Sequence, residues 1–177
     1  MSLAQPHPPV LLLLAAFSRY SEALDWAKQR AEEAWGPVAL ASDRFEHRET
    51  AYYEPTMGPD LVKTFFAFEQ LIDPAALVDR KLASNQWEAD YQHLRRHPEA
   101  RPLNLDPGYL TDAKLVLATT KDRDHRLYLD RGIYAEVTLH FQRGAWQCRP
   151  WTYPDYQRAD YHAFFTRCRE YLRQRGS

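Results

Sequence analysis

The first clear pattern along the chain is an unbroken apolar run at residues 10–17, between Pro8-Pro9 and Ser18. A short, uninterrupted apolar run between turn residues is typical of a strand that is buried on both faces of a sheet. The run is far shorter than the ~20 residues of a membrane helix, and no Lys or Arg precedes it as in a signal peptide. We therefore predict a central strand here and no membrane partner.

Helical and strand patterns follow one another downstream. Apolar residues recur at helical spacing over residues 20–35 and again over 161–173. Asp73-Pro74 is a typical helix start, with Asp as the N-cap and Pro at the first helical position, and it predicts a helix over 73–96. Strands are predicted at residues 38–45, 50–53, 61–69 and 114–119 and in two hairpins over 125–153, with a loop at 53–58 and a turn at 104–109.

These elements predict an α+β fold. The 177 residues suit a single domain, 1–177. We expect a mostly antiparallel, mixed β-sheet with helices packed on one face. With 27% charged and 45% hydrophobic residues, the composition is that of a folded soluble protein.

The two late hairpins allow the strand register to be predicted from turn residues. Asp130-Arg131-Gly132 reads as a three-residue loop with Gly at the left-handed position, and Arg143-Gly144 reads as a two-residue loop. These turns place Leu129 opposite Ile133, Tyr128 opposite Tyr134, Arg126 opposite Glu136, Tyr134 opposite Tyr153, Glu136 opposite Trp151, and Thr138 opposite Arg149.

Alternation of side chains along these strands separates an apolar face from a polar-aromatic face. The apolar face is predicted as core: Leu127, Leu129, Ile133, Ala135, Val137, Leu139, Phe141, Trp146 and Cys148. The other face holds Arg126, Tyr128, Tyr134, Glu136, Thr138, Arg149, Trp151 and Tyr153. It fits a solvated sheet face with an ordinary Arg126–Glu136 surface pair. The interleaving of Arg with aromatic rings favours a ligand-binding face.

The candidate site is built around this face. Candidate catalytic residues are Glu136, as a general base or metal ligand, with Asp106 and His125. Candidate ligand-binding residues are Lys121, Arg126 and Arg149 for phosphate, Tyr134, Trp151 and Tyr153 for stacking on a ring, and Tyr128, Thr138 and Asn104. Asp43, Glu54, Asp106, His125 and Glu136 could supply ligands to a divalent metal ion, but their spacing is not diagnostic of one.

The numbers of charged residues, glycines and cysteines exclude several classes of function. Lys plus Arg is 23 against 24 for Asp plus Glu, so no overall basic field attracts nucleic acid. The six glycines are never closer than twelve positions, which excludes GxGxxG, Walker A and GxSxG loops. Cys148 and Cys168 form neither a zinc motif nor a disulfide framework, and this favours a cytoplasmic location.

Several motifs together resemble one family. The stretches NLDPGYL at residues 104–110, GIYAEVTLHF at 132–141 and WTYPDY at 151–156, with Asp43, Tyr52-Tyr53-Glu54 and His125-Arg126, resemble the uncharacterised bacterial family of domain of unknown function 4416. The resemblance covers nearly the whole chain and implies a cytoplasmic single-domain protein without a known mechanism. Members often carry the label "GTP-binding protein". That label implies guanine-nucleotide binding, and the glycine spacing requires that any such nucleotide is held without a P-loop.

Two functions of different class remain open on these residues. The first is binding of a phosphorylated small molecule or nucleotide, with or without hydrolysis or transfer. The alternative is a non-enzymatic RNA-binding or protein-interaction module, because RNA readers also stack bases on sheet aromatics. A steep salt dependence of RNA affinity would favour the alternative, and stabilisation by a free nucleotide would favour the first.

Overall fold

The computed structural model describes residues 2–176, and in this range an antiparallel sheet runs through the centre of the molecule. Its strand order is β2-β4-β1-β5-β6-β8-β7, with β3 beside β4 and β9 beside β8. The strands are β1 Leu11–Ser18, β2 Val38–Ala41, β3 Phe45–Glu46, β4 Val62–Phe68, β5 Asn104–Leu110, β6 Lys114–Thr119, β7 Leu127–Asp130, β8 Ile133–Gln142 and β9 Ala145–Cys148. The α+β fold with an antiparallel sheet is therefore confirmed, and every pairing between these strands is antiparallel.

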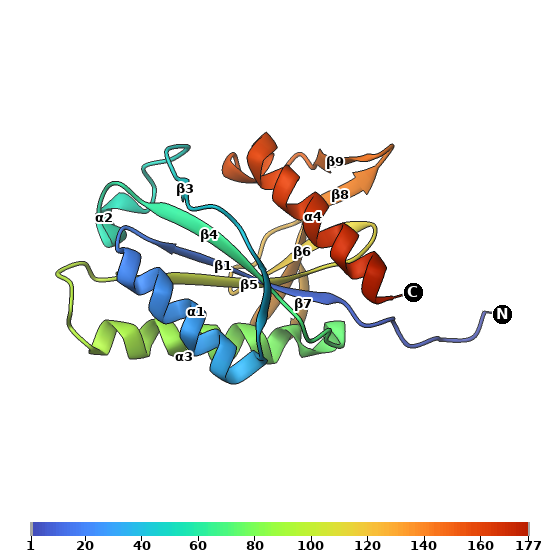
Figure 1. Cartoon of the computed structure of the whole chain (residues 1–177), viewed down its shortest axis with the longest axis horizontal. Helices are drawn as coiled ribbons and strands as arrows, with labels where there is room; N and C mark the ends of the chain where they lie inside the picture. The colour runs from blue at the N-terminus through green and yellow to red at the C-terminus, as the bar shows by residue number, and fades with distance from the viewer. Residues whose placement is uncertain (1, 177) are drawn as a thin grey trace.

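Helices cover both faces of this sheet, whereas the sequence predicted them on one face. They are α1 Ser21–Trp35, α2 Glu54–Met57, α3 Leu77–His93 and α4 Ala159–Arg175, with 3-10 turns η1 Pro74–Ala76 and η2 Asp155–Gln157. Figure 1 shows α1 and α3 below the sheet and α4 above it. The amphipathic pattern of each helix predicts that it covers a sheet, but the pattern alone does not say which face.

The central strand β1 explains why both faces need cover. Leu11 and Leu13 lie in the core beneath α4, while Leu12 and Leu14 lie in the core against α1 and α3. All eight residues of β1 are buried. The predicted central strand is thus confirmed, and it separates two apolar layers.

Two regions differ from the predicted elements. Residues 104–110 form β5, a strand paired with β1 along its whole length, and not a turn. Asp106, Pro107 and Gly108 are poor strand formers, but burial between two cores overrides local propensity. The predicted strand at 50–53 is also wrong, because residues 51–53 form a bend and a turn. The predicted loop at 53–58 contains the short helix α2, with Pro55 in its first turn.

The β7–β8 hairpin is close to the predicted register. Tyr128 pairs with Tyr134 as predicted, but Asp130 rather than Leu129 pairs with Ile133, because a bulge interrupts β7. Since β7 is the last strand of the sheet, Leu127 is 73% exposed and is not part of the core.

The β8–β9 hairpin has the predicted Arg143-Gly144 turn, with both residues at positive φ. Its register holds as far as Leu139 opposite Cys148. There β9 ends, and the chain turns away: Thr152 N–H donates to the Arg149 carbonyl at 3.0 Å. The predicted pairings of Arg149, Trp151 and Tyr153 with β8 are therefore wrong.

Strand β8 also contains a bulge at Thr138. Leu115 of β6 pairs with Leu139, and the next residue, Val116, pairs with Val137, so that Thr138 has no partner on β6. Such an extra residue reverses the alternation of side chains beyond it. Odd-numbered residues of β8 before the bulge therefore face one side of the sheet, and odd-numbered residues after it face the other side.

This bulge decides where Glu136 points. Glu136 pairs with Leu117, and both Leu117 and Leu139 lie on the α4 side of the sheet. Val137 and Ala135 pack instead with Ile133 against α3. The prediction that Val137 and Leu139 share one face is wrong, since turn chemistry does not reveal a bulge five residues away.

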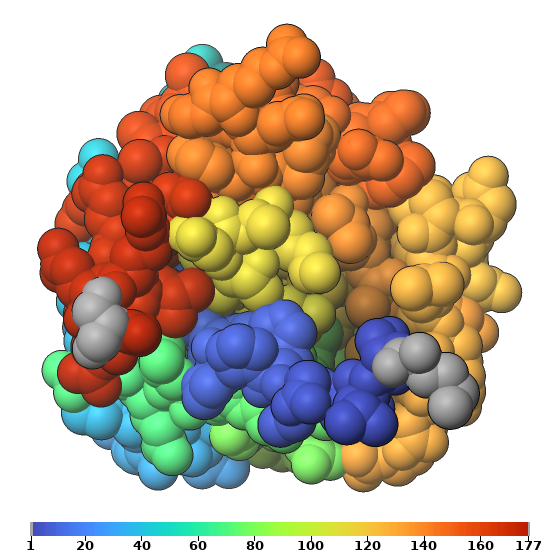
Figure 2. Space-filling view, turned by 90° about the vertical axis from the view of Figure 1, so that its right-hand side faces the viewer, coloured from blue at the N-terminus to red at the C-terminus, as the bar shows by residue number. Residues whose placement is uncertain are grey.

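The C-terminal helix is fixed to the sheet at the β5–β6 turn. Arg169 Nε donates to the Asp112 carbonyl at 2.7 Å, and a guanidinium nitrogen of the same Arg169 lies 2.9 Å from the Asp112 carboxylate. Figure 2 shows this end of the molecule, with the β5–β6 turn in yellow next to α4 in red and the N-terminal segment in blue.

Candidate functional site

A cleft of about 830 Å³ opens where β5 and β6 separate. β5 pairs with β1 over residues 104–110 but with β6 only over 108–110. Asn104 and Asp106 therefore have β1 on one side and the cleft on the other. Helix α3 bounds the cleft from one side, and the segment 151–156 bounds it from the other. Pro107, which lacks an N–H, is tolerated where β6 does not pair.

The structure brings most of the predicted site residues to this cleft. Those that line it are Asn104, Asp106, Lys121, His125, Arg126, Glu136, Trp151 and Tyr153. Those that do not line it are Tyr128, Tyr134, Thr138 and Arg149. Tyr128 and Tyr134 pack edge to face, with their ring centroids 5.3 Å apart.

Glu136 is a buried carboxylate with three donors. His125 Nε2 lies 2.8 Å and Arg126 Nε 3.1 Å from its Oε1, and the Thr138 hydroxyl donates to Oε2 at 3.0 Å. Only 2% of Glu136 and 5% of the Arg126 side chain are exposed, so the expected surface ion pair is a buried one. Arg126 also donates to the Tyr153 hydroxyl at 2.7 Å.

Trp151 packs against the side chains of His125 and Arg149. The His125 ring stacks on it with the centroids 4.9 Å apart, and the Arg149 guanidinium lies 5.2 Å from its centroid. The indole Nε1–H donates to the Val137 carbonyl at 2.9 Å. His125 therefore stacks on one face of Trp151 in the cleft wall, and Arg149 also lies over the indole.

Asp106 lies on the floor of the cleft, where it has one donor on each oxygen. Lys81 Nζ donates to Oδ1 at 3.0 Å, and the Asn104 amide donates to Oδ2 at 2.7 Å. Burial acts to raise the pKa of Asp106, but the charges of Lys81 and Lys63 and these hydrogen bonds outweigh it and hold the pKa below its usual value. Asp106 is therefore an ionised acceptor at neutral pH.

A second buried ion pair lies beside this floor. Lys63 Nζ is 2.5 Å from Asp155 Oδ2, and Lys63 also lies 5.0 Å from the ring centroids of Phe17 and Tyr156. His47 Nδ1 is 3.6 Å from the same Asp155 oxygen. Burial, followed by the charge of Lys63, lowers the pKa of His47, so this imidazole is neutral at pH 7.

Glu88 of α3 completes the inner wall of the cleft. Its Oε1 accepts a hydrogen bond from the Leu105 N–H at 2.6 Å. Burial raises the pKa of Glu88 to about 7, although Lys81, this hydrogen bond and Arg101 act in the opposite direction. Glu88 therefore changes charge near neutral pH.

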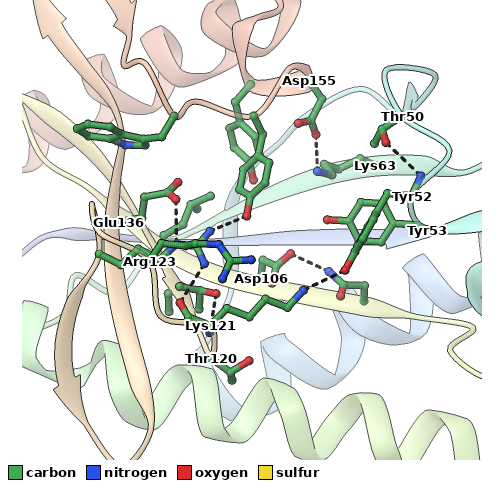
Figure 3. A pocket seen from close by; sticks show the side chains of 18 of the residues that line it. Thr50, Tyr52, Tyr53, Lys63, Asp106, Thr120, Lys121, Arg123, Glu136 and Asp155 are labelled. Atoms are coloured by element: carbon green, nitrogen blue, oxygen red, sulfur yellow. Dashed lines mark hydrogen bonds and ion pairs between the residues drawn. The ribbon is translucent and has the colours of Figure 1, made fainter.

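The mouth of the cleft carries exposed cations and an exposed ring. Lys121 Nζ lies 3.4 Å from the Tyr52 hydroxyl, and Arg123 donates to the neighbouring Asp122 carbonyl at 3.0 Å. In residues 2–176 neither Lys121 nor Arg123 has a carboxylate partner. Figure 3 shows Lys121 reaching across the opening toward Tyr52, with Asp106 behind it and the Lys63–Asp155 pair to one side.

The predicted metal ligands are dispersed. Asp106, His125 and Glu136 line the cleft, but Asp43 and Glu54 do not. Within the described part of the chain, no three His, Cys, Asp or Glu side chains are grouped as a metal ion would require.

Comparison with known proteins gives a family but no activity. The model of Domain of unknown function (DUF4416) matches residues 8–171. The chain belongs to this family. Among curated proteins and among solved structures no match was found. The cleft lies within the matched residues, and the stretches 104–110, 132–141 and 151–156 contribute Asp106, Glu136 and Asp155 to it.

Sequence reasoning missed several charged residues of the cleft. Lys63 lies within the apolar strand VKTFFAF, and Lys81 lies on the buried side of α3. A lysine at a buried position is rare unless it is paired. A lysine within an apolar strand or on the apolar side of a helix was therefore the sequence signal for these residues. Asp155 is part of the WTYPDY motif, but Lys63 lies 92 positions away and nothing local connects them.

No helix of residues 2–176 has the length and apolar character needed to cross a membrane.

Proposed function

We propose that the cleft binds a phosphorylated small molecule or nucleotide. The observation that carries the proposal is the pair of exposed cations at the mouth, Lys121 and Arg123, which have no carboxylate partner among the described residues. A phosphate group supplies the negative charge and the acceptor oxygens that ammonium and guanidinium groups bind. The volume of about 830 Å³ is in the range of small-molecule sites.

The rings that could stack on a ligand are the exposed ones. Tyr52 and Tyr153 are 68% and 42% exposed at the cleft. In the proposal they take this role in place of Tyr134, which does not line the cleft, and of Trp151, which stacks with His125. A nucleotide bound here would be held by side chains, since the chain has no glycine-rich phosphate loop.

If the cleft catalyses hydrolysis or transfer, His125 is the acid–base group of the proposal. Glu136 holds His125 through Nε2 at 2.8 Å, so in the proposal Nδ1 is the nitrogen that exchanges a proton with the ligand. The neighbour of Nδ1 is Asp124, whose side chain is 98% exposed and can be displaced. Glu136 has its own oxygens occupied by three donors, so in this proposal it positions His125.

Thermal stability in the presence of nucleotides and sugar phosphates tests the proposal. A ligand at 100 times its Kd stabilises the folded state by about 2.7 kcal/mol, a shift of several degrees for a chain of this size. We expect the double variant Lys121→Ala/Arg123→Ala to lose this shift. The matched control is Lys28→Ala/Arg167→Ala, which removes one Lys and one Arg from α1 and α4, outside the cleft.

Two outcomes would contradict the proposal. Equal ligand shifts in both double variants would remove phosphate binding from the mouth. Absence of any shift, together with RNA affinity that falls steeply with salt, would favour the RNA-binding alternative.

The proposal places the protein in the cytoplasm, supported by two cysteines that form no disulfide with each other.

A further inference from the structure

The unused hydrogen-bonding capacity of Asp106 bears on what the inner end of the cleft recognises. A carboxylate offers about four acceptor positions, and Lys81 and Asn104 use one on each oxygen. The side chain keeps 35% of its surface exposed, and that surface faces the cleft. Each oxygen can therefore accept one more hydrogen bond from a ligand.

The carboxylate is also held in place. Lys81 Nζ is fixed by a second bond, to the Leu105 backbone carbonyl at 3.1 Å, and the Asn104 side-chain oxygen Oδ1 accepts from Arg101 at 2.6 Å. A group restrained on both oxygens does not have to be ordered when a ligand arrives, and this favours binding.

The surrounding charge selects the kind of donor. Asp106 is flanked by Lys81 and Lys63, and Arg101 lies at the same floor. Lys81 already pairs with Asp106, and Lys63 and Arg101 pair with Asp155 and Glu88, so the floor offers a cationic ligand group no unpaired carboxylate. Neutral hydroxyl or amino donors need none. The exposed cations Lys121 and Arg123 lie on a different wall, on the loop after β6.

We propose that Asp106 accepts hydrogen bonds from neutral hydroxyl or amino groups of the ligand, at the end away from its phosphate. This inference rests on the proposed function only in assuming that the other end of the ligand is a phosphate. The ligand class is then a phosphorylated molecule with neutral donors, which a sugar phosphate supplies through hydroxyls and a nucleotide through the amino group of its base.

Two matched ligand pairs test this role by thermal shift. Ribose 5-phosphate and n-pentyl phosphate share a phosphate and five carbons but differ in hydroxyls. Guanosine and inosine monophosphates differ by one amino group. We expect the donor-bearing member of at least one pair to bind more tightly, by about tenfold or more, the usual effect of a hydrogen bond to a charged group. The pair that responds identifies the source of the donors.

The substitution Asp106→Asn should abolish this difference and leave the shift with n-pentyl phosphate unchanged. Asp25→Asn, on the exposed surface of α1 and outside the cleft, is the matched control and should keep the difference. Because Asp106→Asn leaves Lys81 without its charged partner, the double variant Asp106→Asn/Lys81→Met serves as a second test that does not depend on an unpaired buried lysine.

Failure of this inference differs from failure of the proposed function. All four phosphates giving equal shifts, or a difference that survives in Asp106→Asn, would overturn the role of Asp106 and leave phosphate binding intact. Free ribose at high concentration stabilising the wild type but not Asp106→Asn, with no phosphate effect, would overturn the proposed function alone. No shift with any of these compounds would overturn both.

Discussion

Single buried charges in this protein are each held by several donors. Glu136 accepts hydrogen bonds from His125, Arg126 and Thr138. The pair Arg126–Glu136 has side chains that are 5% and 3% exposed, so its energetics differ from those of a surface pair. An exposed pair contributes about 0–1 kcal/mol, whereas loss of one partner of a buried pair leaves an uncompensated charge.

Arg126→Met should therefore destabilise the protein by about 3–5 kcal/mol. The variant keeps much of the side-chain volume but leaves the charge of Glu136 without its guanidinium. Urea denaturation measures the loss. Arg48→Met is the control, because the side chains of the Arg48–Glu46 pair are 80% and 69% exposed. This variant should change the free energy of unfolding by less than about 1 kcal/mol. Similar losses of stability in both variants would contradict the conclusion that burial makes the Arg126–Glu136 pair important for folding.

Glu88 should make stability depend on pH in the direction opposite to that of most carboxylates. Its pKa rises from 4.5 to about 7 on folding, chiefly through burial. The folded state therefore holds the proton more tightly than the unfolded state. The contribution of Glu88 is most favourable below pH 4.5 and is lost as the pH rises toward 7.

The free energy of unfolding of wild type and Glu88→Gln, measured from pH 4 to 8, tests this. The difference, wild type minus variant, should fall as the pH rises through this window and level off above pH 7. His47→Phe is an informative second variant, because the pKa of His47 is lowered from 6.5 and its contribution is lost as the pH falls through that value. A difference for Glu88→Gln that rises with pH would contradict the assignment.

Strand β8 shows how one irregular residue decides the chemistry of an element. Without the bulge at Thr138, Glu136 would face the opposite side from Leu139, as simple alternation predicts. With it, Glu136 enters the cleft while Val137 packs against α3. The separation of β5 from β6 opens the space that this carboxylate lines.

Truncation to alanine should cost more stability on the buried strand β8 than on the edge strand β7. Leu139→Ala removes a fully buried side chain beneath α4 and should cost about 2–5 kcal/mol. Leu127→Ala, on the edge strand β7 and 73% exposed, should stay within about 0.5 kcal/mol. Chemical denaturation of the two variants decides whether β7 lies outside the core, and equal losses would contradict the edge position.

Across the whole molecule, two apolar layers share the central strand β1. Leu12 and Leu14 belong to the layer with α1 and α3, and Leu11 and Leu13 belong to the layer with α4. Because adjacent residues of one strand support both layers, neither can separate without disturbing the other. The two layers should therefore unfold together.

Leu24→Ala on α1 and Phe165→Ala on α4 test this cooperativity, since each removes a buried side chain from one layer only. We expect losses of about 2–5 kcal/mol for the leucine and about 3–5 kcal/mol for the phenylalanine. In both variants, far-UV circular dichroism and tryptophan fluorescence should give one coincident transition. A fluorescence midpoint that separates from the dichroism midpoint in either variant would show that the layers unfold independently.

Local patterns alone predicted the elements whose signals are short-range. β1 follows from its apolar run, and Asp73 accepts the capping hydrogen bond from Ala75 N–H at 2.8 Å, as its place before Pro74 predicts. The tight turns at Gly132 and Gly144 have the positive φ that glycine allows. In the site, the charged loop after β6 and Glu136 were found from the sequence, because their residue types lie close together along the chain.

The rest required the tertiary structure. β5 forms despite Pro107 and Gly108 because β1 pairs with it along its length, an interaction that local propensity does not contain. The bulge at Thr138 results from matching β8 to β6, and the buried Lys63–Asp155 pair joins residues 92 positions apart. Residue type and local spacing thus determined which groups are available for chemistry. Pairing and burial between distant segments decided which of them meet in the cleft, because those interactions exist only once the chain has folded.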